Sequence, residues 1–566
     1  MINKGVKGSF PSQAVSDAEK MSAEYGAKVG RAIEHEWYSN TTSSNMYMNY
    51  RQNFHNLRLY ARGEQSVRKY KDELSINGDL SYLNLDWKPV PIIPKFVDIV
   101  VNGMADRSYD VKAYSQDPAA IKERTDYVEA ISTDMNAKEL NDTVFNELGV
   151  DIYNTDQTKL PETNEELQLH MQLDYKQSIE IAEEEAINSI FDKNKYDEII
   201  KRINYDLVVI GIGAAKSSFN KAEGIKIEYV DPADLVYSYT DSPNFEDIYY
   251  VGEVKQIYVN ELKKQFPELT DEELESYRGY NKSSYDYSNY DLNNQDENAI
   301  TVLYFEYKTH MNQTYKIKKT ATGGNKAIEK DDTFNPPKSE EFEKVSRAIE
   351  VIYEGVKIVG SNKLLKWELK KNMMRPKSDT TKAQMSYAIV APRKYRGKIN
   401  SLVERITGFA DMIQLTHLKL QQVMSRMVPD GVYVDADSLA EIDLGNGTNY
   451  NPQEALNMYF QTGSVIGRSM TQDGDMNRNR LPITELTSSN GQAKLSSLIN
   501  TYQYYLQMIR DVTGLNEARD GSVPDKNALV GLQKLAAANS NTATRHILKS
   551  NIYITHTNDE TISMRA

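Results

Sequence analysis

The chain of 566 residues contains no cysteine. This absence excludes disulfides, zinc–thiolate sites, iron–sulfur clusters and thiol catalysis. Its apolar runs are far shorter than the roughly 20 residues that cross a bilayer, so no membrane span is expected. Met1 to Tyr25 is polar, mixed in charge and without an apolar h-region, so no secretory signal is predicted. Together these absences favour a soluble intracellular or assembled protein.

Basic residues are too few to offset the acidic ones, at 67 against 81, for a net charge of −14. Lysine and arginine alternate with acids along the chain, so no basic patch is expected, and tight static binding of nucleic acid is disfavoured. Tryptophan (3) and phenylalanine (13) are scarce beside 38 tyrosines. Tyrosine is enriched at protein interfaces, but an ordinary half-buried aromatic role explains it equally well.

The recognisable motifs of catalysis and ligand binding are incomplete. Gly211 to Ser217 (GIGAAKS) lacks the glycine that a phosphate loop places before Lys216, and the same lysine occupies the third glycine position of a dinucleotide fingerprint. We interpret it as a strand-to-turn junction. Asp473 to Asn477 begins like a calcium loop, but Arg478 and Thr484 stand where glycine and glutamate are required. With neither a zinc-binding His-Glu-x-x-His nor a Gly-x-Ser-x-Gly elbow, the sequence predicts no catalytic, cofactor or metal residue.

The first 390 residues predict helices followed by a meandering sheet. Residues 1–40 read as a polar arm that is partly helical at best. Three prolines, at 89, 91 and 94, favour an extended lead-in to an apolar helix, and 118–200 reads as acidic helices. Strands are expected at 206–211, 226–231, 247–253, 300–309 and 351–359, with a flexible surface loop at 278–297.

The strongest periodic element is a helix expected over 399–427. Apolar residues recur there at alternating spacings of about four and three, which is typical of a helix that packs along a seam. The seam residues are Leu402, Ile406, Phe409, Ile413, Thr416, Leu420, Val423 and Met427.

Shorter elements follow this helix in a fixed order. Pro429 and Gly431 end it, and the Gly/Asn/Asp-rich stretch 432–490 predicts a small β-containing module. A second helix is expected at 494–512, then a loop at 513–525. Asp525 is expected to cap a third helix that runs from Lys526 to about Ser550.

This order resembles that of tailed-bacteriophage portal proteins. Five stretches carry the resemblance. Two are similar to the stem helices: 399–427 (INSLVERITGFADMIQLTHLKLQQVMSRM) to the first and 495–514 (LSSLINTYQYYLQMIRDVTG) to the second. The other three are 87–109, similar to the helix where the wing begins, 229–234 (YVDPAD), similar to the wing strand and turn, and 525–529 (DKNAL), similar to the start of the long helix. Tyrosine and asparagine richness suggests the crAss-like phage group.

The resemblance implies an α+β portal-type fold with seven parts: an arm (1–40), a wing (41–392), a first stem helix (393–428), a clip (429–492), a second stem helix (493–512), a tunnel loop (513–525), and a long helix with the start of a crown (526–566). A crown that is short, or that continues beyond residue 566, is expected.

The resemblance further implies a ring of twelve subunits at the unique capsid vertex of a virion, without a cofactor. Expected partners are the terminase motor, the head–tail adaptor and tail proteins, the major capsid protein, and double-stranded DNA in the channel. The channel residues would be Asn516, Glu517, Arg519 and Asp520, with Arg519 a sliding brake between two acids. Subunits would pack through the stem residues Leu402, Ile406, Phe409, Ile413, Leu420 and Val423.

Two other classes remain open. A different head–tail connector or ring protein would share the acidity and the missing cysteines, but would not need two helices around a β module. A metal-dependent nuclease could use scattered carboxylates, and would lose its activity when one Asp or Glu is changed.

Overall fold

The computed structural model mixes helix and sheet, which confirms the α+β class. It describes residues 9–38, 46–75, 85–105, 111–115, 117–150, 160–173, 175–220, 224–277, 299–319, 324–330, 334, 342–376, 378–426, 431–434, 453, 457, 461, 483–486, 489–520 and 530–563. The tyrosine-rich tract 278–297 and the expected cap Asp525 lie outside these residues.

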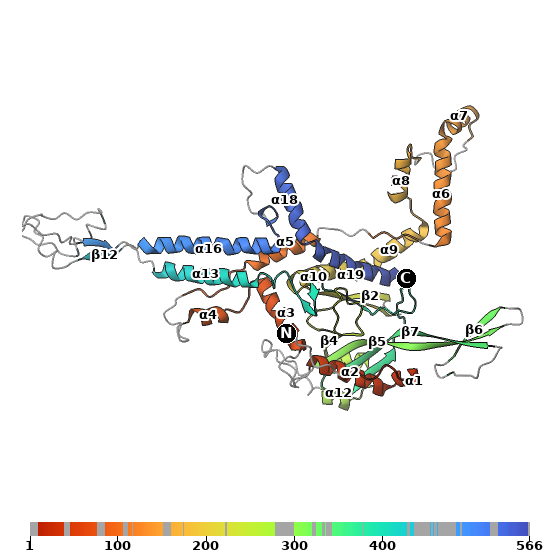
Figure 1. The fold of residues 1–566 in the computed structure, drawn as a ribbon, viewed down its shortest axis with the longest axis horizontal. Coiled ribbons are helices and arrows are strands. Elements are labelled where there is room, and N and C mark those ends of the chain that lie inside the picture. The colour runs from red at the N-terminus through yellow and green to blue at the C-terminus, as the bar shows by residue number, and fades with distance from the viewer. Residues whose placement is uncertain are drawn as a thin grey trace, which may run out of the picture. The chain divides into compact units, whose positions relative to one another are not determined.

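The chain forms two compact units (Figure 1). The larger unit comprises Met1–Ala61, Pro94–Arg405 and Glu517–Ala566, and the smaller comprises Arg62–Ile93 and Ile406–Asn516.

Helices of the larger unit are α1 (Asp17–Lys20), α2 (Ala23–Tyr38), α3 (Met46–Arg62), α5 (Ile93–Ala105), α6 (Pro118–Asn136), α7 (Lys138–Leu148), α8 (Asn164–Leu173), α9 (Ser178–Lys193), α10 (Tyr196–Val209), α11 (Val259–Gln265), α12 (Asp271–Tyr277), α17 (Glu517–Asp520), α18 (Val530–Ala543) and α19 (Arg545–Ser563). Its strands are β1 (Gly213–Asn220), β2 (Gly224–Tyr229), β3 (Leu235–Tyr237), β4 (Tyr250–Tyr258), β5 (Ala299–Lys319), β6 (Asn325–Lys330), β7 (Phe342–Ile358), β8 (Leu364–Leu369), β9 (Tyr387–Val390), β10 (Lys394–Tyr395) and β11 (Lys398–Ile399). The smaller unit contains α4 (Arg68–Leu74), α13 (Thr407–Arg426), α16 (Ser489–Thr513), β12 (Gly431–Val434) and β13 (Ile483–Leu486).

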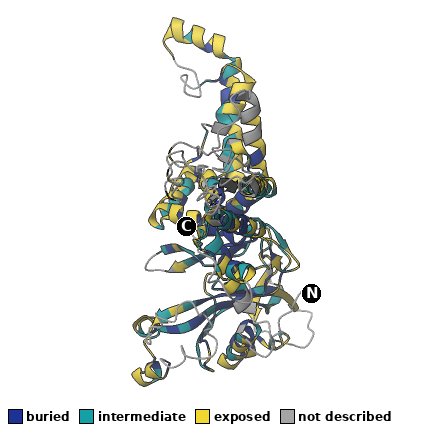
Figure 2. Ribbon diagram, turned by 90° about the vertical axis from the view of Figure 1, so that its left-hand side faces the viewer, coloured by how far each residue is buried: buried dark blue, intermediate teal, exposed yellow. Residues whose placement is uncertain are grey.

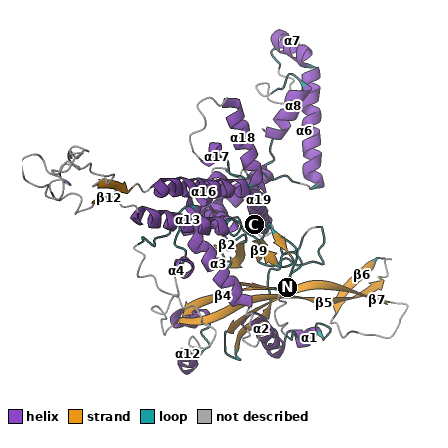
Figure 3. Ribbon diagram, turned by 60° about the vertical axis from the view of Figure 1, so that its left-hand side comes forward, coloured by secondary structure: helices purple, strands orange, loops and turns teal. Residues whose placement is uncertain are grey.

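A six-stranded sheet organises the larger unit. Its strand order is β3-β4-β5-β7-β8, and β6 pairs with the far end of β5. The two longest strands, β5 and β7, pair antiparallel from Val302 opposite Ile358 to Lys318 opposite Phe342 (Figure 3). The strands expected at 300–309 and 351–359 are therefore confirmed, although both extend well beyond the expected bounds.

Helix α2 packs against β7 and β8, so the prediction of a polar N-terminal arm is wrong for this segment. Val29, Ile33 and Trp37 are buried, and the Trp37 indole donates a 3.0 Å hydrogen bond to the Tyr250 hydroxyl. Only an apolar stripe interrupted by charged residues marks this helix in the sequence, and its polar residues face outward. Figure 2 shows buried residues where helices cover the strands.

Glycines let α2 approach the sheet closely. A Cβ atom at Gly26 would lie 2.4 Å from the Trp367 ring on β8, and one at Gly30 would lie 3.4 Å from the Phe305 ring on β5. The Phe305 ring also covers Gly355 on β7, where a Cβ would lie 2.3 Å from it. The large rings fill the space that the missing side chains leave.

A second, three-stranded sheet (β2-β1-β9) is covered by α10 and α19. The expected strand at 206–211 is wrong, because Leu207 to Val209 form the last turn of α10 and are buried there. A short run that is apolar on every side fits a covered helix as well as a strand. The GIGAAKS motif is thus a helix-to-strand junction: Gly211 adopts φ +80°, and a Cβ at Gly213 would lie 2.9 Å from Ile203.

The predicted third helix, 526–550, is also only partly correct. Two helices, α18 and α19, occupy the region and are separated at Thr544, and α19 continues to Ser563. Residues 521–529 lie outside the described part.

Many tyrosines belong to the core of the larger unit. Tyr250, Tyr307 and Tyr353 are fully buried, and Tyr250 donates to the Glu36 carboxylate at 2.9 Å. For these residues the ordinary role of a buried aromatic applies rather than a role at an interface.

A buried charge network ties α3 to α10 and to the turn after β2. Arg58 donates two hydrogen bonds to Asp231 (2.8 and 2.9 Å) and one to Asp206 (3.0 Å). The Tyr229 hydroxyl also donates to Asp206. Burial raises the pKa of Asp206 to about 6, although Arg58 and Tyr229 both favour its ionised form. The network fixes the YVDPAD segment to two helices.

Replacing Arg58 with methionine should destabilise the protein by about 3 kcal/mol, because buried Asp206 and half-buried Asp231 then lose their cation. Urea unfolding of the full chain would measure this change. The matched control is Arg31→Met at an exposed position on α2, which should leave the midpoint nearly unchanged. Equal midpoints for the two variants would contradict a stabilising role for the network.

Candidate functional site

The smaller unit is built on two long helices, α13 and α16, which pack side by side and run antiparallel (Figures 1 and 3). The expected second helix at 494–512 is confirmed, and α16 extends it to 25 residues. At one end of the pair, β12 and β13 form an antiparallel ladder from Gly431 opposite Leu486 to Val434 opposite Ile483. The expected β-containing module is confirmed at this ladder, and most residues between its strands lie outside the described part.

The N-terminal half of α13 is covered on a second side by the segment 62–93. Leu415 and Leu418 pack with Tyr70 in one core cluster, to which Trp87 also belongs. Buried Gln414 accepts from the Val90 amide at 2.7 Å and donates to the Lys88 carbonyl at 3.2 Å. Residues 85–92 form neither helix nor strand, and their prolines leave backbone groups for side-chain partners, while the expected extended conformation stays a prediction.

The predicted first stem helix begins eight residues too early. Ile399 lies in β11, and Leu402 and Ile406 are buried in turns that precede α13. Leu402 belongs to the larger unit, whereas Ile406 belongs to the smaller. The apolar spacing continues on the N-terminal side of α13, because Leu402 and Ile406 are buried there although they are not helical.

Within α13 the seam is only partly buried. Ile413 and Thr416 are buried, whereas Phe409, Leu420 and Val423 are half-buried. Met427 lies outside the described residues.

The outer faces of the helix pair expose large apolar side chains. Met412, Met424, Ile499 and Tyr504 are 43%, 57%, 45% and 59% exposed. Among the described side chains of α16, Ile509 is the one buried hydrophobic residue. Two helices with so much uncovered apolar surface are typical of an assembly that supplies further neighbours.

The predicted tunnel loop begins with a regular helix end. Gly514 adopts φ +72°, and its amide donates to the Arg510 carbonyl at 2.8 Å, which closes α16. Leu515 is buried and Asn516 half-buried. The segment was predicted to contain no secondary structure, but α17 forms one helical turn over Glu517–Asp520.

Arg519 is bound to protein groups of the larger unit. Its Nη1 donates to the Ser540 carbonyl at 3.0 Å and to the Thr544 hydroxyl at 3.1 Å, at the end of α18. A cation at this position stabilises the C-terminal carbonyls of a helix. Glu517 is exposed, and the side chain of Asp520 lies outside the described part. The DNA contact expected at Arg519 therefore stays a prediction, and the geometry gives this residue a structural role.

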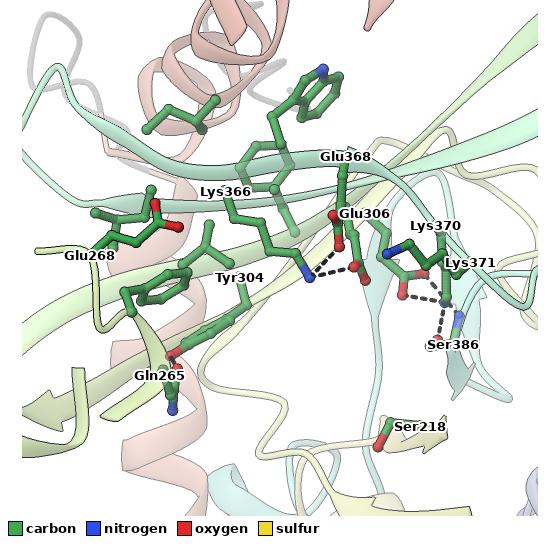
Figure 4. Close-up of a pocket in the computed structure, with 18 of the residues that line it drawn as sticks. Ser218, Gln265, Glu268, Tyr304, Glu306, Lys366, Glu368, Lys370, Lys371 and Ser386 are labelled. Atoms are coloured by element: carbon green, nitrogen blue, oxygen red, sulfur yellow. Dashed lines mark hydrogen bonds and ion pairs between the residues drawn. The ribbon is translucent and has the colours of Figure 1, made fainter. Parts of the chain in front are cut away.

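An open cleft of about 1200 Å³ lies in the larger unit, and the sequence analysis did not identify it (Figure 4). Strands β1, β5, β7 and β8 line it with lysines that pair with glutamates. Lys366 lies 2.5 Å from Glu354 and 2.8 Å from Glu368, and Lys370 lies 2.6 Å from Glu306. The alternation of lysine and glutamate in 366–370 is the signal that could have indicated it.

The cleft holds its charges in fixed pairs. Burial opposes ionisation of Glu306, but Lys370 and the Ser386 amide lower its pKa below the ordinary value. Burial likewise opposes the charge of Lys216, but Tyr387 and Glu253 raise its pKa. Lys216 of β1 pairs with Glu253 of β4, and the Ser386 amide donates to Glu306 of β5, so these contacts connect the two sheets.

In the described part of the chain, no group of three His, Asp or Glu side chains is arranged to hold a metal ion. Among the described helices, none is long and apolar enough to cross a bilayer.

No protein-family model matches the chain, and no curated protein sequence matches it.

Replacing Arg519 with methionine should loosen the junction of α17 with α18, because two hydrogen bonds from a charged donor are lost. The expected loss is about 2 kcal/mol, which limited proteolysis between α16 and α19 would detect as faster cleavage. Arg545→Met, at an exposed position on the neighbouring helix, is the control and should cleave like the parent. If Arg519→Met is cleaved as slowly as the parent, Arg519 does not stabilise this junction. The channel role expected from the sequence would then be the better assignment.

Proposed function

We propose that this chain is a portal protein of a tailed bacteriophage. The order of elements supports it: a long helix, a β ladder and a second long helix follow one another as the resemblance implies. After them, a one-turn helix and two shorter helices stand where the resemblance implies a loop and one long helix. The smaller unit would be the stem with its clip, and the sheets of the larger unit the wing.

One observation carries the proposal: the α13–α16 pair has too few neighbours within its own chain. With 25 residues, α16 is about 37 Å long, and one partner helix covers only a stripe of it. Copies standing side by side around an axis would cover the remaining apolar faces, and a closed ring leaves no end uncovered. Twelve subunits is the number that the resemblance implies.

The net charge of −14 fits a channel through which DNA slides. An acidic wall releases no counterions from the phosphate backbone, so it does not hold the duplex tightly. In this role the ring would stand at the capsid vertex, contact the major capsid protein, and bind first the terminase motor and then the adaptor and tail. The chemistry of packaging would belong to the motor, so the portal itself needs no catalytic group or cofactor.

Purified protein should form rings with an axial channel in electron micrographs. Changing Met424 and Tyr504 to glutamate should prevent ring closure, because both exposed side chains would lie between neighbouring copies. The control is Leu140→Glu on α7, a position that is 67% exposed outside the helix pair, and it should assemble normally.

Sedimentation separates the outcomes. A parent protein that remains a 64.5 kDa species at micromolar concentration in near-physiological salt would contradict the proposal. Rings that form equally well from the double variant would place the subunit interface elsewhere and leave a different connector as the better assignment.

The clip should carry tail attachment. Replacing residues 436–480 with a short linker should leave the larger unit folded but produce particles without tails, because the insertion between the two helices would meet the motor and the adaptor. Electron microscopy of particles from a complemented phage would score this, with far-UV circular dichroism of the purified variant as the folding control. Infectious, tailed particles would contradict the assignment.

A further inference from the structure

The far end of the six-stranded sheet is a three-stranded ribbon, in which β6 and β7 flank β5 (Figure 3). Side chains along a strand alternate between two faces, and residues directly opposite one another share a face. On β5, Thr314, Lys316 and Lys318 therefore point to the same side. Their partners are Lys330, Ile328 and Lys326 on β6, and Ser346, Lys344 and Phe342 on β7.

This side gathers five lysines, and we call it the lysine face: Lys316, Lys318, Lys326, Lys330 and Lys344. The register is confirmed by the hydroxyls of Thr314 and Ser346, which lie 3.2 Å apart on the same side. Four of the lysines are exposed and Lys316 is half-buried. In these three rows of described residues, the register brings no acidic residue to the lysine face.

The acids of the ribbon lie on its opposite face. Glu329 accepts a 3.2 Å hydrogen bond from Gln313, which in turn accepts from Arg347 at 2.9 Å, and Glu343 shares this face. The expectation that no basic patch exists is therefore wrong. Lysines and acids alternate along these strands, and a period of two places them on different sides of the sheet.

The arrangement does not serve the stability of the sheet. Lys318 stands directly opposite Lys326, and Lys316 directly opposite Lys344. Like charges at directly opposite positions destabilise strand pairing. A face of this kind is expected where a polyanion, rather than the fold, requires the charges.

We propose that the lysine face binds the phosphate backbone of double-stranded DNA. The three rows at Thr314, Lys316 and Lys318 span about 13 Å along the strands. Over that length of its axis a DNA duplex carries about eight phosphates, counted on both strands. The four exposed lysines, whose ammonium groups are flexible, can each reach a phosphate without a fixed register, so binding would not depend on sequence.

The composition of the face favours a duplex over an acidic protein partner. A protein partner would need an apolar centre, but lysine is depleted at such centres, and Ile328, at 37% exposed, is the large apolar side chain described on this face. The inference does not depend on the proposed ring, since it concerns a ribbon of the larger unit and not the channel.

Fluorescence anisotropy of the full chain with a mixed-sequence duplex of about 30 base pairs, about three helical turns, tests the proposal. Four phosphate contacts, one from each exposed lysine, predict that the affinity falls about 150-fold between about 50 and 200 mM salt. Lys318→Gln with Lys326→Gln should reduce this fall to about 12-fold, because two contacts are lost. The same reduction is expected for Lys330→Gln with Lys344→Gln, which tests the face again if the first variant folds poorly.

Lys122→Gln with Lys201→Gln removes the same charge from exposed positions on α6 and α10, and should bind like the parent. The thermal midpoint of Lys318→Gln with Lys326→Gln should equal or exceed that of the parent, because an opposed pair of like charges is removed. No salt-dependent binding by the parent, or the same salt dependence in parent and ribbon variants, would overturn the proposal. The proposal would also be overturned if a ribbon variant changed its self-association in sedimentation but kept its DNA affinity. The lysine face would then bind an acidic surface of a second copy of the chain.

Discussion

The larger unit depends on the backbone pairing of β5 with β7. Three further strands pair with this ladder directly: β4 and β6 pair with β5 at different ends, and β8 pairs with β7, while β3 is attached through β4. Around Phe305 and Lys357 the ladder is covered by α2, whereas the described side chains of β5 from Tyr315 onward are half-buried or exposed. One pair of strands thus supports both the aromatic core and the ribbon that carries the lysine face.

The smaller unit depends on the packing of two long helices, α13 and α16. These helices give each other one covered side, and the segment around Val90 covers α13 on another through the side chain of Gln414. The buried amide of Gln414 satisfies two backbone groups that the prolines at 89 and 91 leave without partners in regular structure. The smaller unit is therefore stabilised on one side by the hydrogen bonds of Gln414 with the segment around Val90, and it exposes large apolar side chains on its outer faces.

The sequence allowed elements with a strong period to be predicted, and it failed where burial and secondary structure give the same pattern. The strands around Val302 and Val351 and the helix α16 follow from alternation and from a helical stripe. Leu207 to Val209 is apolar at every position, because the last turn of α10 is buried on all sides, so its helical period was hidden. Leu402 and Ile406 continue the spacing of α13 although they are buried in turns. The stripe of α2 was obscured by charged residues that face outward.

The candidate site shows the same limit more strongly. The exposed faces of α13 and α16 could be expected from their apolar content, but the partner of Arg519 could not, because Ser540 and Thr544 are distant in sequence and contribute a carbonyl and a hydroxyl without any pattern. The lysine face depends on strand register, which the sequence alone leaves undetermined.

The packing of Phe305 against Gly355 and Gly30 restricts how these positions can change over evolutionary time. A Cβ at Gly355 would lie 2.3 Å from the ring, and α2 is close enough for Gly30 to touch the same ring. A side chain can therefore appear at Gly355 only after the ring at 305 has become smaller, and a smaller residue at 305 leaves a cavity that a glycine at 355 cannot fill. A larger residue at 355 alone, or a smaller residue at 305 alone, is unfavourable, whereas the two substitutions together compensate each other. Among descendants of this chain, positions 305 and 355 should therefore change together.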